Sequence, residues 1–270
     1  MNESIPVSPL ASRLEQAPSP AASIPLDHSD RLNFMGLPMQ SQNSLGVGIY
    51  SYADAARFIG AHPRDLRRWM HGYAYKGRGG EPEYSAPLWD GQLSETDIDG
   101  LGFRDLIELR FVHTFRNSGV PLFLIRRTIE EARASFDTPY PFTSARFKTD
   151  GKRIFMEVIE DSGDKSLVDV VKRQNVFGKV ISQSLREGIE LNLQDKATRW
   201  YPIRNSKAIV FDPDRKFGQP ILADYGVPTA ALIEAVKAEG GDEKRVAKMY
   251  EVPVAAVRKA LQFEKRILAA

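Results

Sequence analysis

The segment from residue 49 to residue 70, IYSYADAARFIGAHPRDLRRWM, constrains the fold most, because it has the start and stop signals of two short helices joined by a tight turn. Ser51 is a typical N-cap for the first helix. Gly60 ends that helix, since glycine enters the left-handed region at little cost. Pro63 is tolerated in a first helical turn and opens the second helix, so we predict a helix-turn-helix. The apolar residues at helical spacing in the first helix are Ala53, Ala56 and Ile59.

The second helix combines an apolar edge with a basic one. Leu66 and Trp69, three residues apart, can pack inward. A short helix that docks through one apolar edge and presents arginines on the other fits a recognition helix in a DNA major groove. The residues that we expect to contact DNA from the helix-turn-helix are Arg64, Arg67, Arg68, His71, Tyr52 and His62.

The charge around these helices agrees with this interpretation. The net charge of the whole chain, +2, is too small to indicate a class of partner. Residues 57–78, however, contain six Lys or Arg and one acid, Asp65. Such a local excess attracts a phosphate backbone, but an ordinary solvated helix face explains a charge run at least as well. In combination with the helix-turn-helix signals, the charge excess favours DNA binding over an ordinary solvated face.

A β-hairpin is predicted directly after the second helix. Tyr73 and Tyr75 alternate before the sequence KGRGG, which is typical of a glycine-rich hairpin tip and carries Lys76 and Arg78. A hairpin in this position is the wing of a winged helix, whose tip lies along flanking phosphates or in the minor groove. The same glycines lack the spacing and the strand–loop–helix context of a nucleotide-binding loop.

The middle of the chain predicts helices and another hairpin. Residues 103–117 and 121–136 are apolar at positions suited to two packed helices. Residues 146–160 combine a turn, TDGK, with the alternating run RIFMEVIE, so we predict a second hairpin there. Residues 167–193 have apolar residues at varied spacing and predict a strand with a helix, or two helical turns.

The C-terminal segment, residues 206–270, predicts a short strand pair followed by three helices. Thr229 and Asp242 are the expected N-caps of the first two helices. The fold class is therefore mainly α with small β hairpins (α+β). The predicted parts are a disordered tail at 1–44, a winged helix-turn-helix DNA-binding domain at 45–140, a β-hairpin and connecting region at 141–205, and a three-helix domain at 206–270.

Composition argues against several classes of function. The chain has no cysteine and four scattered histidines, so we expect no metal site and no cofactor. No nucleophile–base pair stands out, and we predict no catalytic residues and no enzyme activity. There is no apolar run of membrane-spanning length and no signal-peptide pattern, so we expect a cytoplasmic protein without membrane contact.

Two motifs carry a family resemblance. YSYADAARFIG, the turn, PRDLRRWM and the hairpin that follows resemble the MerR-like helix-turn-helix of bacterial regulators, without their long coiled coil. The segment FGQPILADYGVPTAALIEAVKAEGGDEKRVAKMYEVPVAAVRKAL resembles a small bacterial family of unknown function whose members are described as antitoxins. That family usually has the segment GTRIPV, with a threonine and an arginine, where this chain has ADYGVPT. Together, in this order, they are similar to VapB-type antitoxins.

The resemblance implies a repressor that binds its own operator DNA as a homodimer and neutralises a PIN-like ribonuclease toxin. Residues expected to bind that partner are Phe211, Phe217, Pro220 and Ile221, although the same four can equally fill a small core. The alternative function is a protein-interaction or dimerisation module that does not bind DNA. Absent or salt-insensitive DNA binding distinguishes this alternative from the repressor.

Overall fold

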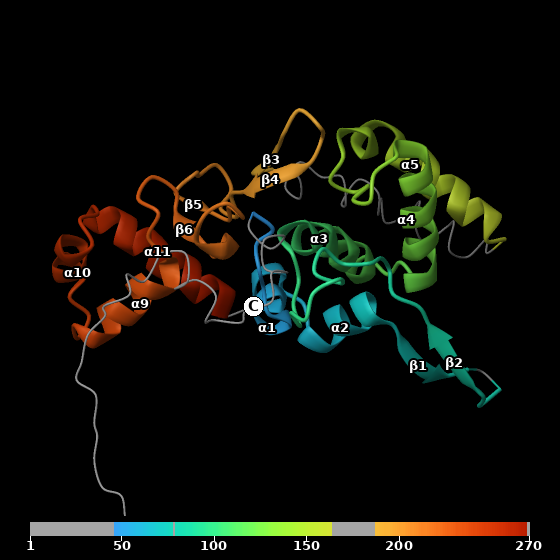
Figure 1. Cartoon of the computed structure of the whole chain (residues 1–270), viewed down its shortest axis with the longest axis horizontal. Coiled ribbons are helices and arrows are strands. Elements are labelled where there is room, and N and C mark those ends of the chain that lie inside the picture. The colour runs from blue at the N-terminus through green and yellow to red at the C-terminus, as the bar shows by residue number, and fades with distance from the viewer. Residues whose placement is uncertain (1–45, 78, 164–186, 269–270) are drawn as a thin grey trace, which may run out of the picture. The chain divides into compact units, whose positions relative to one another are not determined.

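The fold mixes helices with small antiparallel strand pairs (Figure 1). The computed structural model describes residues 46–77, 79–163 and 187–268. The predicted tail at 1–44, residue Arg78 and most of 167–193 lie outside the described residues. The helices are α1 (Tyr52–Ile59), α2 (Pro63–His71), α3 (Phe103–Asn117), α4 (Leu122–Phe136), α5 (Ala145–Asp161), α9 (Thr229–Ala238), α10 (Glu243–Met249) and α11 (Val254–Leu268). The strands are β1 (Tyr73–Lys76), β2 (Pro82–Ser85), β3 (Ile189–Leu191), β4 (Ala197–Trp200), β5 (Ile209–Val210) and β6 (Ile221–Leu222).

The helix-turn-helix forms where the sequence predicts it. The hydroxyl of Ser51 accepts a hydrogen bond from the Asp54 amide at 3.0 Å and caps α1. Gly60 ends α1 in the left-handed region, at φ 74°. Pro63 is the first residue of α2. The buried face of α1 differs from the predicted one, because Tyr52, Ala55 and Ala56 are buried while Ala53 is exposed.

A hairpin follows α2 directly. Strands β1 and β2 pair antiparallel, with Tyr73 opposite Ser85 and Lys76 opposite Pro82. Figure 1 shows this hairpin projecting from the end of α2. The glycine-rich connection closes through a hydrogen bond from the Gly77 amide to the Glu81 carbonyl, at 2.9 Å.

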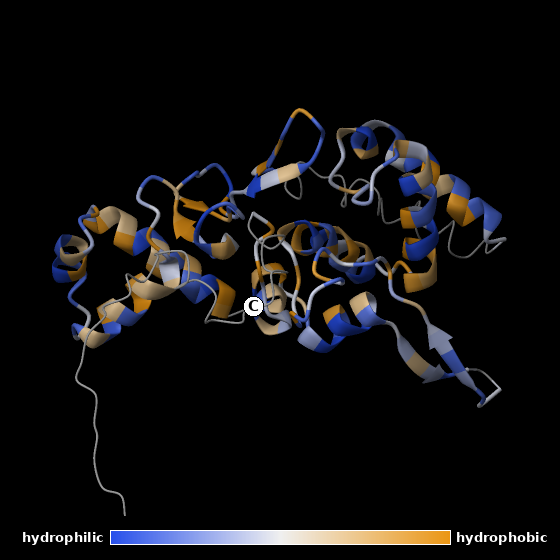
Figure 2. Ribbon diagram, in the orientation of Figure 1, coloured by the Kyte–Doolittle hydropathy of each residue, from blue (hydrophilic) through white to orange (hydrophobic). Residues whose placement is uncertain are grey.

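Helix α5 corrects the hairpin predicted at residues 146–160. Its buried residues recur at intervals of three and four, which is the helical period rather than the strand period. Ser144 caps its start by accepting a hydrogen bond from the Phe147 amide at 3.2 Å. Figure 2 shows α4 and α5 with hydrophobic and hydrophilic bands along their length, as expected for helices packed on one side. The buried residues of α5 are Phe147, Gly151, Ile154, Phe155, Val158 and Ile159.

The C-terminal segment forms the predicted strand pair and three helices. Strands β5 and β6 pair antiparallel, and the helices α9, α10 and α11 pack together. Asp242 caps α10 as predicted, accepting hydrogen bonds from two backbone amides. Thr229, in contrast, is not an N-cap: Pro228 holds that position, and the buried Thr229 hydroxyl donates to the Glu264 carboxylate.

An aromatic cluster joins the helix-turn-helix to the C-terminal segment. Phe211 is fully buried and stacks on Trp200, with ring centroids 4.6 Å apart. Phe58 of α1 meets the same ring edge-on at 4.9 Å, and Phe263 of α11 approaches it at 6.2 Å. The helix-turn-helix and the C-terminal helices therefore share one hydrophobic core. In the part of the chain that the structure describes, no helix is both long and apolar enough to cross a membrane.

Candidate nucleic-acid interface

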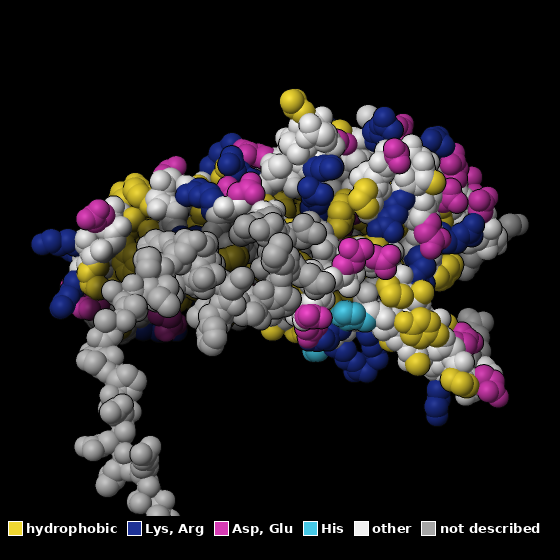
Figure 3. Space-filling view, viewed as in Figure 1, with side chains coloured by type: hydrophobic (Ala, Val, Ile, Leu, Met, Phe, Trp, Pro, Cys, Tyr) yellow, Lys and Arg dark blue, Asp and Glu magenta, His cyan; other side chains and the backbone are white. Residues whose placement is uncertain are grey.

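Helix α2 presents a basic face to solvent. Leu66, Trp69 and Met70 are buried beneath it. Arg64, Arg67 and His71 are exposed and Arg68 is half-buried, as the sequence predicts for the outward edge. Figure 3 shows Lys, Arg and His side chains gathered on the surface over α2.

Arg67 is held by a residue that the sequence did not indicate. Its guanidinium donates two hydrogen bonds to the Asp99 carboxylate, Nη1 to Oδ1 at 3.1 Å and Nη2 to Oδ2 at 2.7 Å. Both side chains are at least half exposed. The pair lowers the pKa of Asp99 and keeps it ionised. The bidentate fork that would read a guanine or a phosphate is thus already occupied.

Tyr52, which the sequence predicts to contact DNA, lies beneath Arg67 and not on the exposed face. Its ring is buried, and the Arg67 guanidinium lies over it at 4.5 Å from the centroid. Its hydroxyl shares a hydrogen bond of 2.7 Å with Nε2 of His71. Burial, aided by the Asp99 charge, raises the pKa of Tyr52 to about 12. Tyr52 therefore positions two residues of the basic face.

The other residues predicted to contact DNA are His62, Arg68, Lys76 and Arg78, and their surroundings differ. His62 is exposed, and its ring Nδ1 accepts a hydrogen bond from the Arg64 amide at 3.1 Å, so it caps α2. Arg68 lies over the Tyr73 ring at 5.0 Å from the centroid. Lys76 is exposed at the end of β1, and Arg78 lies outside the described residues.

The hairpin is fastened to the helices from both sides. The hydroxyl of Tyr84 donates to the His71 carbonyl at 3.0 Å, which ties β2 to the end of α2. Arg126 of α4 donates to the Ser85 hydroxyl at 3.0 Å and to the Ala86 carbonyl. The base of the hairpin therefore keeps a fixed relation to the basic face of α2.

Asp105 orders the loop that carries Asp99. It is buried on α3, and its carboxylate accepts hydrogen bonds from Trp89 Nε1 at 2.9 Å, from the Gln92 amide at 2.8 Å and from the Gly102 amide at 3.0 Å. Burial raises the pKa of Asp105, while these donors act in the opposite direction. The three bonds pin the loop at both ends, so Asp99 is presented to Arg67 by an ordered segment.

Three of the four residues predicted to bind a partner are core residues. Phe211, Pro220 and Ile221 are buried, so the core interpretation holds for them. Phe217 is different: its side chain is 63% exposed and its φ is 55°, in the left-handed region. Two bonds hold this turn in place, from the Ile49 amide to the Phe217 carbonyl at 3.0 Å and from the Tyr50 hydroxyl to the Gly218 carbonyl at 2.7 Å.

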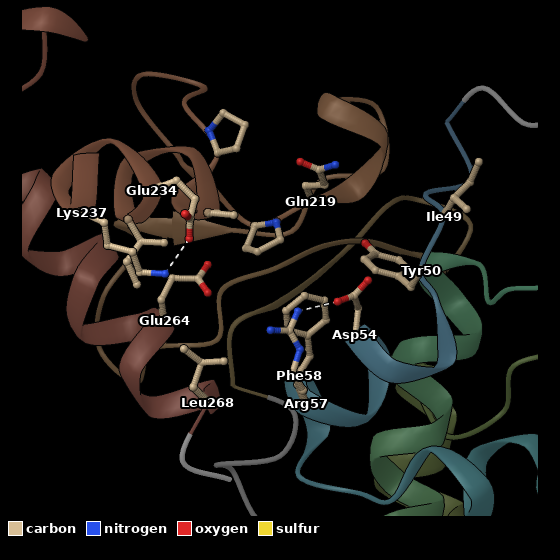
Figure 4. A pocket seen from close by; sticks show the side chains of 14 residues that line it. Ile49, Tyr50, Asp54, Arg57, Phe58, Gln219, Glu234, Lys237, Glu264 and Leu268 are labelled. Atoms are coloured by element: carbon tan, nitrogen blue, oxygen red, sulfur yellow. Dashed lines mark hydrogen bonds and ion pairs between the residues drawn. The ribbon is translucent and has the colours of Figure 1, made fainter. Parts of the chain in front are cut away.

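A pocket of about 370 Å³ is lined by α1 on one side and by the C-terminal helices α9 and α11 on the other. Figure 4 shows Tyr50, Asp54 and Phe58 on one wall and Glu234, Lys237 and Glu264 on the other. Arg57 pairs with Asp54, and Lys237 pairs with Glu234 at 2.7 Å. Each wall therefore carries one ion pair, and Glu264 accepts a hydrogen bond from the Thr229 hydroxyl instead.

The described residues hold no cluster of three or more His, Asp or Glu suited to a metal ion. Asp212 and Asp214 form a turn instead, in which Asp212 Oδ1 accepts a hydrogen bond from the Asp214 amide at 3.1 Å. The other Asp212 oxygen accepts from Arg199 Nε at 2.9 Å. Both carboxylate oxygens of Asp212 therefore accept hydrogen bonds from within the chain.

Comparison with known proteins places a helix-turn-helix in this region. Residues 48–129, from just before α1 into α4, match a protein-family model described as "Putative DNA-binding HTH domain". The "Putative antitoxin VapB45" of Mycobacterium tuberculosis is 25% identical over 224 residues, covering 80% of this chain and 93% of that protein. The "Uncharacterized protein Rv2308" of the same organism is 24% identical over 246 residues, covering 86% of this chain and 96% of that protein.

A solved structure has the same fold. The crystal structure of Rv2018 from Mycobacterium tuberculosis superimposes with a TM-score of 0.58, at 24% identity, over 80% of this chain and 98% of that one. At this identity the likeness supports the fold alone. The chain therefore carries a helix-turn-helix domain of the DNA-binding kind within a mixed α fold with small antiparallel hairpins.

Proposed function

We propose that this chain is a DNA-binding antitoxin of a type II toxin–antitoxin system. In this role it represses transcription from its own operator and neutralises a PIN-like ribonuclease toxin. The observation that carries the DNA-binding part is α2, which buries Leu66, Trp69 and Met70 and exposes a row of basic side chains. The name of the Mycobacterium tuberculosis relative supports the antitoxin part.

In the proposed complex, α2 lies in the major groove and the β1–β2 hairpin acts as the wing of a MerR-like domain. Arg64 and His71 reach base edges or phosphates directly, and Arg67 does so after leaving Asp99. Lys76, with Arg78 at the hairpin tip, contacts flanking phosphate or the minor groove. One recognition helix per subunit implies a homodimer on half-sites about one helical turn apart.

In the same proposal, residues 206–270 hold the toxin and 45–140 bind DNA. Phe217 is the anchor that we assign to the toxin, because it is a large exposed aromatic in a strained but firmly bonded turn. Strain of this kind persists where the surrounding structure fixes it, and it is concentrated at functional positions.

A gel-shift titration tests DNA binding. The full chain is titrated against the DNA upstream of its own gene in rising salt, with the Arg64→Ala variant beside it. Loss of one bidentate guanine contact should cost about 1–3 kcal/mol and relax sequence specificity. Arg146→Ala on α5, which removes the same charge from an exposed position away from α2, is the matched control. Unchanged operator affinity in R64A would contradict the assignment of α2.

A second titration tests the antitoxin part. The product of the adjacent gene is added to the protein–DNA complex and, separately, assayed as a ribonuclease with and without this chain. We expect the chain to inhibit that ribonuclease and Phe217→Ala to weaken the inhibition without unfolding the protein. A neighbour that has no ribonuclease activity would remove the toxin from the proposal and leave DNA binding untouched.

A protein-interaction or dimerisation module without DNA binding is the second candidate function. The observation that favours it is the Arg67–Asp99 pair, which already occupies the best DNA-reading fork of α2. In that case the chain would show no salt-sensitive binding to any duplex, and removing Asp99 would not create it.

A further inference from the structure

A second pocket is lined by the helix-turn-helix and the C-terminal segment, and it shares Arg57 and Phe58 with the first. Its volume is about 350 Å³, within the range of small-molecule sites. It is bounded by the end of α1 with its turn, by α3, by Trp200 of β4 and by α11. Aromatic side chains contribute three of its walls, namely Phe58, Trp200 and Phe263.

Arg110 of α3 lines this pocket in an unusual state. Its Nη1 is shielded from solvent and has no hydrogen-bond partner, and within the described residues its guanidinium has no ion pair. Its guanidinium lies over the Trp200 ring, 4.1 Å from the centroid, which offsets only part of the desolvation cost. Burial lowers the pKa of Arg110 to about 9, so the side chain is still a cation at neutral pH.

The other polar residues of the pocket do not compensate this charge. None of its described lining residues is acidic. Arg57 is paired with Asp54, and Arg266 donates to the Pro202 carbonyl at 3.2 Å. Burial lowers the pKa of His113, so it adds no cation at neutral pH. A buried, uncompensated guanidinium is costly, and a bound anion is the simplest group that removes the cost.

We propose that this pocket binds a small organic anion with an aromatic or otherwise apolar body. Its carboxylate pairs with the Arg110 guanidinium, whose Nη1 has no hydrogen-bond partner in the described part of the chain, because a planar carboxylate matches a planar guanidinium. Its body lies among Phe58, Trp200 and Phe263, which supply apolar contact. None of the residues that line this pocket is among those proposed to contact DNA, so the two sites can be tested separately.

Calorimetry and thermal unfolding of the full chain, in phosphate-free buffer and without DNA, test the site. The probes are benzoate, its neutral analogue benzamide, and inorganic phosphate. We expect benzoate to bind and to raise the unfolding temperature, with little effect of the other two. Equal shifts from benzamide would overturn the recognition of an anion, and equal shifts from phosphate would overturn the role of the apolar body.

Variants make the test specific to Arg110. Arg110→Met keeps the apolar stem and removes the charge, and it should weaken benzoate binding by roughly 10–100-fold, the value of a charge-assisted hydrogen bond. Arg127→Met, an exposed arginine on α4, should bind benzoate like the wild type. Without a probe, R110M should be at least as stable as the wild type, because it buries no unpaired charge. Undiminished benzoate binding in R110M, or no benzoate binding by the wild type, would overturn the proposal.

Discussion

Asp99 determines whether the Arg67 guanidinium on the basic face of α2 is available to a ligand. Its pair with Arg67 is exposed, and exposed pairs contribute little to stability, so a phosphate or a guanine can displace the carboxylate. The carboxylate also repels the DNA backbone at close range. If α2 is the recognition helix that we propose, Asp99 beside it should suppress weak, non-specific binding more than specific binding.

Removing this carboxylate should strengthen binding to DNA. We expect Asp99→Asn to bind both operator and unrelated duplex more tightly, with a dependence on salt that is steeper by about one phosphate contact. Asp97→Asn, which removes the same charge from an exposed position two residues away, is the control. Fluorescence anisotropy at several salt concentrations gives both slopes. If D97N matches D99N, the effect is one of general charge and not of the freed Arg67.

Phe217 allows a test of backbone strain at one residue. Its φ of 55° costs a residue with a Cβ atom about 1–2 kcal/mol, whereas glycine adopts it freely. Because both substitutions remove the exposed ring, Phe217→Gly should be more stable than Phe217→Ala by about 1 kcal/mol. Denaturant unfolding measures the difference. The ordinary order, with alanine the more stable, would show that this turn relaxes out of the left-handed region.

At the scale of the element, Gly60, which ends α1, and Gly72, which ends α2, should differ in their tolerance of a side chain. A Cβ at Gly60 would meet no atom within 4 Å, while at Gly72 it would lie 2.6 Å from the Ser85 carbonyl oxygen. Both have positive φ. We expect Gly60→Ala to cost about 1 kcal/mol through φ alone. Gly72→Ala should cost more and should displace the hairpin from α2.

Unfolding in denaturant and the operator affinity of the two variants distinguish these effects. Gly60→Ala should keep the affinity once it is folded, whereas Gly72→Ala should lose the contribution of the hairpin. Equal losses of affinity would mean that the hairpin does not need its fixed attachment to α2.

The helix boundaries around α1 and α2 were predictable because each depends on a local residue preference, such as the cap at Ser51 or the turn at Gly60. Helix α5 was missed because Gly151 was interpreted as part of a turn. That glycine lies mid-helix for a reason that only the packing shows: a Cβ there would lie 2.6 Å from the Phe147 ring. The spacing of Ile154, Phe155 and Val158 was the helical signal that was available.

The candidate site was predictable only where one helix supplies it. The basic edge of α2 follows from helical spacing, and so does the burial of Leu66 and Trp69. Asp99 is 32 residues from Arg67 in sequence, and no local pattern pairs them. The same holds for Phe211, whose burial depends on rings from α1, β4 and α11 that meet only in the folded chain.

At the scale of the whole molecule, this shared aromatic core connects the helix-turn-helix to the C-terminal helices. Phe58 is on the helix that supports α2, and Phe211 joins it to the segment that carries Phe217. Under the proposed function, we expect a change of packing at Phe211 to affect the DNA-binding and the toxin-binding segments together. In the antitoxin that we propose, this is the physical route by which a bound toxin would alter affinity for DNA.

The stability of the whole fold should also depend on pH through Glu108. This carboxyl is buried on α3 and accepts hydrogen bonds from the Phe142 amide at 3.1 Å and from the amide and hydroxyl of Thr143, each at 2.8 Å. Burial outweighs these donors and raises the pKa of Glu108 from 4.5 to about 7. The folded chain thus holds this proton more tightly than the unfolded chain does.

The sign of the effect follows from that difference. Below pH 4.5 the contribution of protonated Glu108 is fully present, and it is lost as the pH rises towards 7, by up to about 3 kcal/mol at 1.4 kcal/mol for each pKa unit. Glu108→Gln cannot titrate, so the difference in unfolding free energy between wild type and E108Q should change across this window and level off above it. Denaturant unfolding at a series of pH values measures it, with the exposed Glu131→Gln as control. A difference that stays constant from pH 4.5 to 7 would show that Glu108 is ionised in the folded protein throughout, its three hydrogen bonds outweighing its burial.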